Sequence, residues 1–210
     1  MIAAILAGSG ICSSALAAAS SPARPANTIL VLGDSLSAEY GLKRGSGWVG
    51  LLEQKLKTEK ISAKVVNASI SGDTTSGGRA RLGALLMQHQ PTLVVIELGA
   101  NDALRGLPLA LTSDNLLAMT RQAQHGGARV LFLGMQMPPN YGRDYGQRFA
   151  DMYAEVAKST RASLVPFLLK GIADAPDSMA WFQADRIHPR EEAHPRMLAN
   201  VWPALKKGLR

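Results

Sequence analysis

The stretch NTILVLGDSLSAEYG, residues 27–41, is the starting point for predicting the fold of this chain. Its aliphatic run, residues 29–32, has the length and β-branched character of a strand that is buried on both faces. Gly33 ends that run, and Asp34 and Ser35 follow at once. Because glycine permits a tight exit from a strand, the stretch predicts a buried strand that delivers reactive oxygen groups to the loop beyond it.

Strand-like and helix-like segments alternate along the rest of the chain. We expect five strands, at residues 28–32, 63–67, 93–98, 129–133 and 163–167. A last helix is expected after Pro195, and four other helical patterns lie at residues 49–59, 79–90, 115–127 and 148–160. This alternation predicts a three-layer α/β/α sandwich around a mostly parallel five-stranded sheet. Ligands bind beyond the carboxyl ends of the strands in such sheets, so a site is expected in the loops there.

The first nineteen residues, MIAAILAGSGICSSALAAA, carry no charge and end in small residues. They have the apolar region and the cleavage site of an export signal, although the charged residues that usually begin one are missing. A retained membrane anchor is the alternative, but the glycines and serines make a poor spanning helix. We expect a signal peptide at residues 1–19, cleaved after Ala17 or Ala19, a linker at residues 20–26, and a single domain at residues 27–210 in the periplasm or secreted.

The composition narrows the possible chemistry. Cys12 is the only cysteine, so a cleaved chain would have no thiol for a nucleophile, a zinc site or a disulfide. The net charge is +7, but lysines and arginines are scattered and only four Tyr and four Phe are available for stacking. We therefore expect no nucleic acid partner. A solvated basic surface is expected instead, which could contact anionic lipid peripherally or steer acidic substrates.

Four short blocks carry the residue types that a hydrolase needs. Gly33-Asp34-Ser35 follows the first strand, the block from Asn67 to Asp73 follows the second, and Gly99-Ala100-Asn101-Asp102 follows the third. Asp185-Arg186-Ile187-His188 stands near the end of the chain. Together, and in this order, the blocks resemble the signature of the GDSL, or SGNH, hydrolase family. The resemblance spans residues 28–203 and is closest to its bacterial exported thioesterases, arylesterases and lysophospholipases.

The resemblance implies a flavodoxin-like fold and a role for each block. Ser35 would be the nucleophile, His188 the general base, and Asp185 the carboxylate that holds the imidazole. The backbone amides of Ser35 and Gly72 and the side chain of Asn101 would form the oxyanion hole. We accordingly expect a monomeric enzyme that cleaves small-molecule acyl esters or thioesters through an acyl-enzyme, with no cofactor and no metal.

The chemistry of these residues supports the same assignment. A serine hydroxyl is a poor nucleophile until an imidazole takes its proton, and the imidazole needs a partner that fixes its tautomer. Asp185 and His188 are three residues apart, so one turn of chain can present both. Each residue alone has a simpler interpretation: Ser35 could cap the next helix, and Gly72 and Asn101 could be turn residues.

A second histidine and a metal site are the main alternatives in the late loop. Glu191 and His194 repeat the spacing of Asp185 and His188, but Pro195 favours a helix start at His194. The same four side chains are enough to bind a metal, although two prolines prevent one helix from aligning them. His89 and His125 end helical patterns, where a positive charge is favourable, and we interpret them as structural.

A glycine-rich motif matches a dinucleotide-binding pattern, but we do not expect a dinucleotide site there. Gly45-Ser46-Gly47-Trp48-Val49-Gly50 fits the dinucleotide pattern G-x-G-x-x-G, but no strand leads directly into it. We expect Trp48 to pack the first helix onto the sheet instead.

A leucine-rich segment follows the third block. Leu104, Leu107, Leu109 and Leu111 are interrupted by a glycine and a proline, so one regular helix is not expected. We interpret these leucines as a movable wall of an acyl-binding groove, with a self-packed loop as the alternative. Two other functions also stay open: a polysaccharide or cell-wall O-deacetylase using the same triad, and a noncatalytic α/β binding module.

Overall fold

A computed structural model describes residues 27–209. The expected signal peptide and linker, residues 1–26, lie outside the described residues. A parallel sheet of five strands forms the centre, in the order β2-β1-β3-β4-β5. The strands are β1 (Asn27–Gly33), β2 (Ala63–Asn67), β3 (Leu93–Glu97), β4 (Arg129–Leu133) and β5 (Ser163–Val165).

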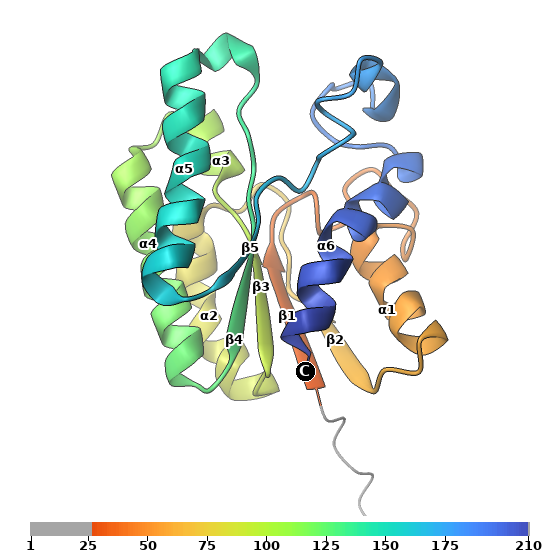
Figure 1. Cartoon of the computed structure of the whole chain (residues 1–210), viewed down its shortest axis with the longest axis vertical. Coiled ribbons are helices and arrows are strands. Elements are labelled where there is room, and N and C mark those ends of the chain that lie inside the picture. The colour runs from red at the N-terminus through yellow and green to blue at the C-terminus, as the bar shows by residue number, and fades with distance from the viewer. Residues whose placement is uncertain (1–26, 210) are drawn as a thin grey trace, which may run out of the picture.

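Helices cover both faces of this sheet (Figure 1). On one face lie α1 (Trp48–Thr58) and α6 (His194–Gly208), and on the other lie α2 (Thr75–His89), α4 (Leu109–His125) and α5 (Arg143–Thr160). The short helix α3 (Ala100–Leu104) follows β3 directly, and three single 3₁₀ turns are η1 (Pro139–Tyr141), η2 (Ser178–Trp181) and η3 (Glu191–Ala193). The predicted three-layer α/β/α sandwich with five parallel strands is confirmed.

The differences from the predicted boundaries have local causes. The fifth strand was expected to reach Phe167 but ends at Val165, since Pro166 has no N–H to donate to the sheet. The second helix begins at Thr75, where the side chain of Thr74 accepts a hydrogen bond from the N–H of Gly77.

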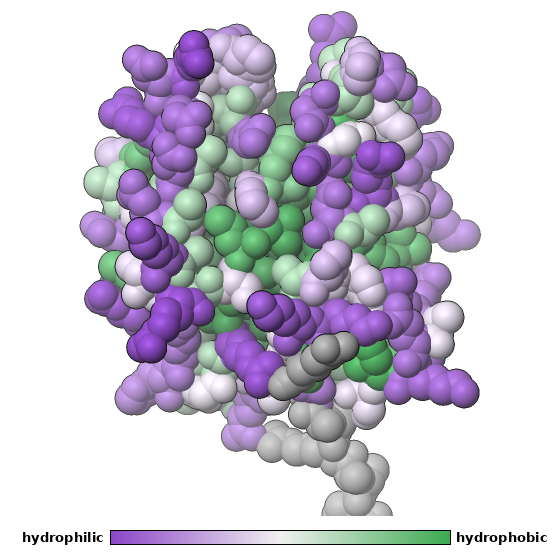
Figure 2. Space-filling model, viewed as in Figure 1, coloured by the Kyte–Doolittle hydropathy of each residue, from purple (hydrophilic) through white to green (hydrophobic). Residues whose placement is uncertain are grey.

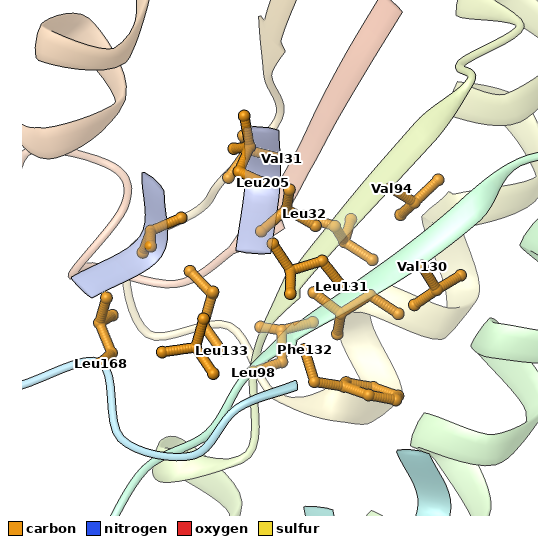
Figure 3. Packing of buried hydrophobic residues seen from close by; sticks show 14 of the residues in the cluster. Val31, Leu32, Val94, Leu98, Val130, Leu131, Phe132, Leu133, Leu168 and Leu205 are labelled. Atoms are coloured by element: carbon orange, nitrogen blue, oxygen red, sulfur yellow. The ribbon is translucent and has the colours of Figure 1, made fainter. Parts of the chain in front are cut away.

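The core lies around β1, β3 and β4. Every residue of β3 is buried, as are the last five of β1 and the last four of β4. Burial on both faces explains the uninterrupted aliphatic runs in the sequence. Figure 3 shows side chains from these strands packed with others from the helix layer, such as Leu205 of α6.

The carboxyl ends of the strands face the top of the molecule in Figure 1, away from the first described residues. Two segments rise above this edge as arms. One is the connection from β4 to α5, which contains η1, and the other is the connection from β5 to α6, which contains η2. Figure 2 shows a notch between the two arms. None of the helices at residues 27–209 is long and apolar enough to cross a membrane.

Candidate active site

Ser35 lies directly beyond the carboxyl end of β1, in a tight turn. The side chain of Asp34 stabilises this turn, because its Oδ1 accepts a hydrogen bond from the N–H of Leu36 at 3.0 Å. The Asp34 carbonyl also accepts the N–H of Ala38 at 2.9 Å. Ser35 does not cap the next helix, since α1 begins at Trp48. The turn therefore holds the Ser35 hydroxyl at the edge of the sheet.

The late loop brings His188 to Ser35. His188 Nε2 is 2.9 Å from Ser35 Oγ, although 153 residues separate the two. His188 Nδ1 is 2.7 Å from Asp185 Oδ2. This carboxylate contact favours the tautomer with the ring proton on Nδ1, which leaves Nε2 to accept the proton of the Ser35 hydroxyl. A serine, a histidine and an aspartate thus form a continuous chain of hydrogen bonds.

Asp185 is held by the same turn that carries His188. Its Oδ1 accepts the backbone N–H groups of Ile187 at 2.9 Å and His188 at 3.0 Å. These bonds and the imidazole contact stabilise the charged carboxylate, with the His188 N–H as the largest cause, and lower the pKa of Asp185 to about 2. Asp185 is therefore ionised at neutral pH.

Gly72 and Asn101 come from the loops after β2 and β3. Gly72 has φ 77°, a conformation that favours glycine. Asn101 is the second residue of α3, and this helix begins directly after Gly99, which has φ 122°. The two loops are tied together, because the N–H of Thr75 donates to Asp102 Oδ2 at 2.9 Å. Gly72 and Asn101 thus lie in the connections that follow the two strands flanking β1, on either side of Ser35.

These groups share one cavity of about 520 Å³. Ser35, Gly72, Asn101 and His188 line its polar side. Its other walls are mostly apolar and come from the connections after β3, β4 and β5: Leu104, Met135, Met137, Pro138, Phe167, Leu169 and Ala173. An apolar hollow with a few convergent polar groups is typical of a site for an apolar ligand.

The leucine-rich segment is only partly where the sequence predicted it. Leu104 lines the cavity, whereas Leu107, Leu109 and Leu111 are not among its lining residues. The helix α4 begins at Leu109, six residues earlier than expected, so Leu109 packs against the core and Leu111 lies in the first turn. These three leucines do not line the cavity in this structure, and most of its apolar wall comes from the connections after β4 and β5.

His194 has a different environment from His188. It is buried, and its Nδ1 accepts the backbone N–H of Trp48 at 3.0 Å. Burial lowers the pKa of His194, and a hydrogen bond to the Pro189 backbone opposes that effect. Glu191 and His194 therefore do not join the chain formed by Asp185 and His188. Within residues 27–209, no group of three or more His, Cys, Asp or Glu side chains is arranged to hold a metal ion.

The glycine-rich motif has a structural explanation. Trp48 is fully buried in the core, as expected. A Cβ atom at Gly50 would lie 2.5 Å from the carbonyl oxygen of Gly45, so the chain needs a small residue there. The motif allows a tight turn before α1.

Three residues near the site were not assigned from the sequence. Tyr40 lies against His188, with ring centroids 4.2 Å apart and an interplanar angle of 35°. Asp34 and Glu97 are buried carboxyl groups behind Ser35. Asp34 Oδ2 accepts a hydrogen bond from Asn101 Nδ2 at 2.9 Å. The Gly33-Asp34-Ser35 block was the only signal for Asp34, and Glu97 is the single charged residue in an otherwise aliphatic strand.

Comparison with known proteins decides the family. Residues 31–196 match the model of the GDSL-like Lipase/Acylhydrolase family. The chain belongs to this family. It is 52% identical to esterase TesA of Pseudomonas aeruginosa over 181 residues, which cover 86% of this chain and 89% of the relative. A crystal structure of TesA matches with a TM-score of 0.83 and 51% identity, covering 87% of this chain and 99% of that one.

Two further relatives carry related names. An arylesterase of Vibrio mimicus is 41% identical, covering 90% of this chain and 94% of the relative. Thioesterase 1/protease 1/lysophospholipase L1 of Escherichia coli is 42% identical, covering 82% of this chain and 80% of the relative. The GDSL-like chain is therefore a serine hydrolase that acts on carboxylic esters, as the sequence predicted.

Proposed function

We propose that Ser35, His188 and Asp185 are the catalytic triad of this esterase. The observation that carries the proposal is the unbroken chain from Asp185 Oδ2 through both ring nitrogens of His188 to Ser35 Oγ, with distances of 2.7 and 2.9 Å. His188 takes the proton of Ser35 as its oxygen attacks the acyl carbon. The imidazolium then gives the proton to the leaving alcohol or thiol, and an acyl-enzyme remains. Water repeats the same steps and releases the acid.

The oxyanion formed in each step needs donors placed in advance. We propose the backbone N–H groups of Ser35 and Gly72 and the side-chain NH₂ of Asn101 for this role. Gly72 and Asn101 line the same cavity as the Ser35 hydroxyl. An amide adds a donor without adding charge, and each such donor can contribute about a hundred- to a thousandfold in rate.

The substrates proposed are acyl esters and thioesters with an apolar acyl chain. The apolar walls of the cavity support this, because they lie beside the Ser35 hydroxyl and are large enough to take part of an acyl chain. The names of the relatives include an arylesterase and a thioesterase/lysophospholipase, which agrees with this substrate class.

A fluorophosphonate probe tests the proposal directly. It should label the wild-type protein at Ser35 and leave a folded Ser35→Ala variant unlabelled, since only an activated serine reacts. Ester hydrolysis should disappear in the same variant. Labelling at another residue, or activity near that of the wild type in Ser35→Ala, would contradict the assignment.

We also propose that the mouth of the cavity contacts an anionic lipid surface. Tyr40, Leu104 and Ile187 line the cavity and are exposed, and Arg186 is beside them. Such a rim can insert apolar groups while the basic surface attracts anionic headgroups. Ile187→Ser should reduce sedimentation with anionic vesicles. Met87→Ser is the control, because Met87 is exposed on α2 and does not line the cavity. Equal binding by both variants would rule this surface out.

We also propose that the protein is exported and that it is a monomer. The uncharged apolar stretch at residues 1–19 supports export to the periplasm or the medium, with cleavage after Ala17 or Ala19. Mass spectrometry of the N-terminus after expression of the full chain tests this. For the monomer that we propose, light scattering should give the mass of one chain.

A further inference from the structure

Glu97, the last residue of β3, is a fully buried carboxyl group directly behind the site. Its Oε2 accepts hydrogen bonds from Ser37 Oγ at 2.7 Å and from the backbone N–H of Asp34 at 3.3 Å. Ser37 Oγ in turn accepts the indole N–H of Trp48 at 3.2 Å. Glu97 Oε1 is buried and has no partner among the described residues. An unpaired charged carboxylate would be very costly in such a place, so this arrangement favours the neutral acid.

Gly33 leaves space for this carboxyl group. Gly33 is paired with Glu97 in the register of β1 and β3. A Cβ atom at Gly33 would lie 2.9 Å from Glu97 Oε2 and 2.9 Å from Ser37 Cβ. Glycine is therefore needed at position 33, because a side chain there would collide with Glu97 and Ser37 beneath the turn.

Glu97 and Asp34 form a close pair of carboxyl groups. Burial raises the pKa of Asp34 to about 6, against the lowering effect of hydrogen bonds such as that from the Leu36 N–H. Burial, followed by the charge of Asp34, raises the pKa of Glu97 well above its ordinary value. Of the neighbouring ionisable groups, His188 acts on Asp34, and Tyr153, whose pKa is raised by burial, is also acted on by both carboxyl groups. Since two like charges cannot both ionise cheaply here, the proton resides on Glu97.

We propose that Glu97, as a neutral acid, is a positioning residue for ester hydrolysis. It holds the backbone of Asp34 and the hydroxyl of Ser37, and so keeps the Asp34 carboxylate on Asn101 Nδ2, 2.9 Å away. This inference rests on the proposed role of Asn101 as an oxyanion donor. A negative charge on Glu97 would lie behind that donor and oppose the charge that develops on the substrate oxygen.

Two substitutions separate this role from simple packing. Glu97→Gln keeps the size, the acceptor oxygen and the neutral state, so its kcat at neutral pH should stay within about threefold of the wild type. Glu97→Leu leaves Ser37 and the Asp34 N–H without an acceptor. It should lower kcat by about ten- to a hundredfold with little change in KM, a smaller loss than direct removal of an oxyanion donor.

The pH profile gives a readout that packing alone would not move. In the wild type, kcat should fall at alkaline pH as Glu97 ionises, whereas Glu97→Gln should keep its activity there. Both are measured with a short-chain nitrophenyl ester and corrected for spontaneous hydrolysis. Tyr153→Phe is the matched control: it removes a buried hydrogen bond to the carbonyl of Leu98, one residue past Glu97, and should keep kcat and the alkaline loss.

The outcomes distinguish this inference from the proposed function. If Glu97→Gln loses as much kcat as Glu97→Leu, if Glu97→Leu keeps its kcat, or if the alkaline loss persists in Glu97→Gln, the positioning role is wrong. Should Glu97→Leu fail to fold, the alkaline profile of Glu97→Gln decides alone. The triad and the oxyanion hole are judged separately, by fluorophosphonate labelling at Ser35 and by the kcat of Asn101→Ala.

Discussion

The backbone N–H of Trp48, the first residue of α1, donates a hydrogen bond to Nδ1 of His194, the first residue of α6, at 3.0 Å. Gly47 provides no side-chain cap for α1. His194 therefore satisfies one of the free N–H groups at the start of a helix that lies far from it in the sequence. The histidine that competes with His188 by spacing is thus a structural link between the two helices on one face of the sheet.

This link predicts opposite effects for the two histidines. His194→Ala leaves the Trp48 N–H without an acceptor and should lower the free energy of unfolding by about 1 to 3 kcal/mol, with kcat nearly unchanged. His188→Ala should keep the stability but lower kcat by at least about a thousandfold. Urea unfolding and hydrolysis of a nitrophenyl ester measure the two effects. A larger loss of kcat in His194→Ala would move the triad to Glu191 and His194.

Burial of His194 also predicts a pH dependence of stability. Its pKa is lowered from 6.5 in the folded protein, so below about pH 6.5 the unfolded chain binds a proton that the folded chain does not. The free energy of unfolding should therefore fall on acidification. His194→Gln removes this titration, so its stability deficit relative to the wild type should shrink between pH 8 and pH 5. A constant deficit for His194→Gln would contradict the interpretation.

The sequence predicts the sheet well because its strands are buried on both faces and their aliphatic runs are continuous, as in β3. It also predicts which loops meet, since Ser35, Asn101 and their neighbours directly follow strands whose carboxyl ends share one edge. The role of Glu97 could not be predicted, because its burial depends on Gly33 of the neighbouring strand. The cavity wall was also missed, since Met135 and Phe167 belong to connections that only the fold brings together.

The proposed oxyanion hole predicts a large effect on turnover for Asn101. Asn101→Ala removes one donor that acts in the transition state, so kcat should fall by about a hundred- to a thousandfold while KM changes little. Fluorescence-monitored unfolding of the same variant checks that the fold is intact. A rate equal to that of the wild type would make Asn101 a turn residue that only supports α3.

Tyr40 predicts a smaller, ring-dependent effect. The ring centroids of Tyr40 and His188 are 4.2 Å apart. When His188 takes the proton of Ser35 it becomes a cation, and the Tyr40 ring then contacts a positive charge. Contact between an aromatic ring and a cation is worth about 0.5 to 2 kcal/mol. Tyr40→Leu should therefore lower kcat by about two- to thirtyfold, whereas Tyr40→Phe, which keeps the ring, should stay within about twofold of the wild type. Equal losses in the two variants would show that the hydroxyl, not the ring, matters.

The cavity wall gives a prediction with a matched control. Leu104 and Leu111 are the same residue type, and each is 44% exposed, but only Leu104 lines the cavity. Leu104→Ala removes apolar contact with an acyl chain, and each buried CH₂ of that chain is worth about 0.8 kcal/mol. The ratio of kcat/KM for a long-chain ester to that for a short-chain ester should therefore fall by about three- to tenfold in Leu104→Ala. Leu111→Ala should leave the ratio unchanged. If both ratios stay at the wild-type value, the acyl chain does not lie against Leu104, and the wall formed by Met135 and Phe167 becomes the next segment to test.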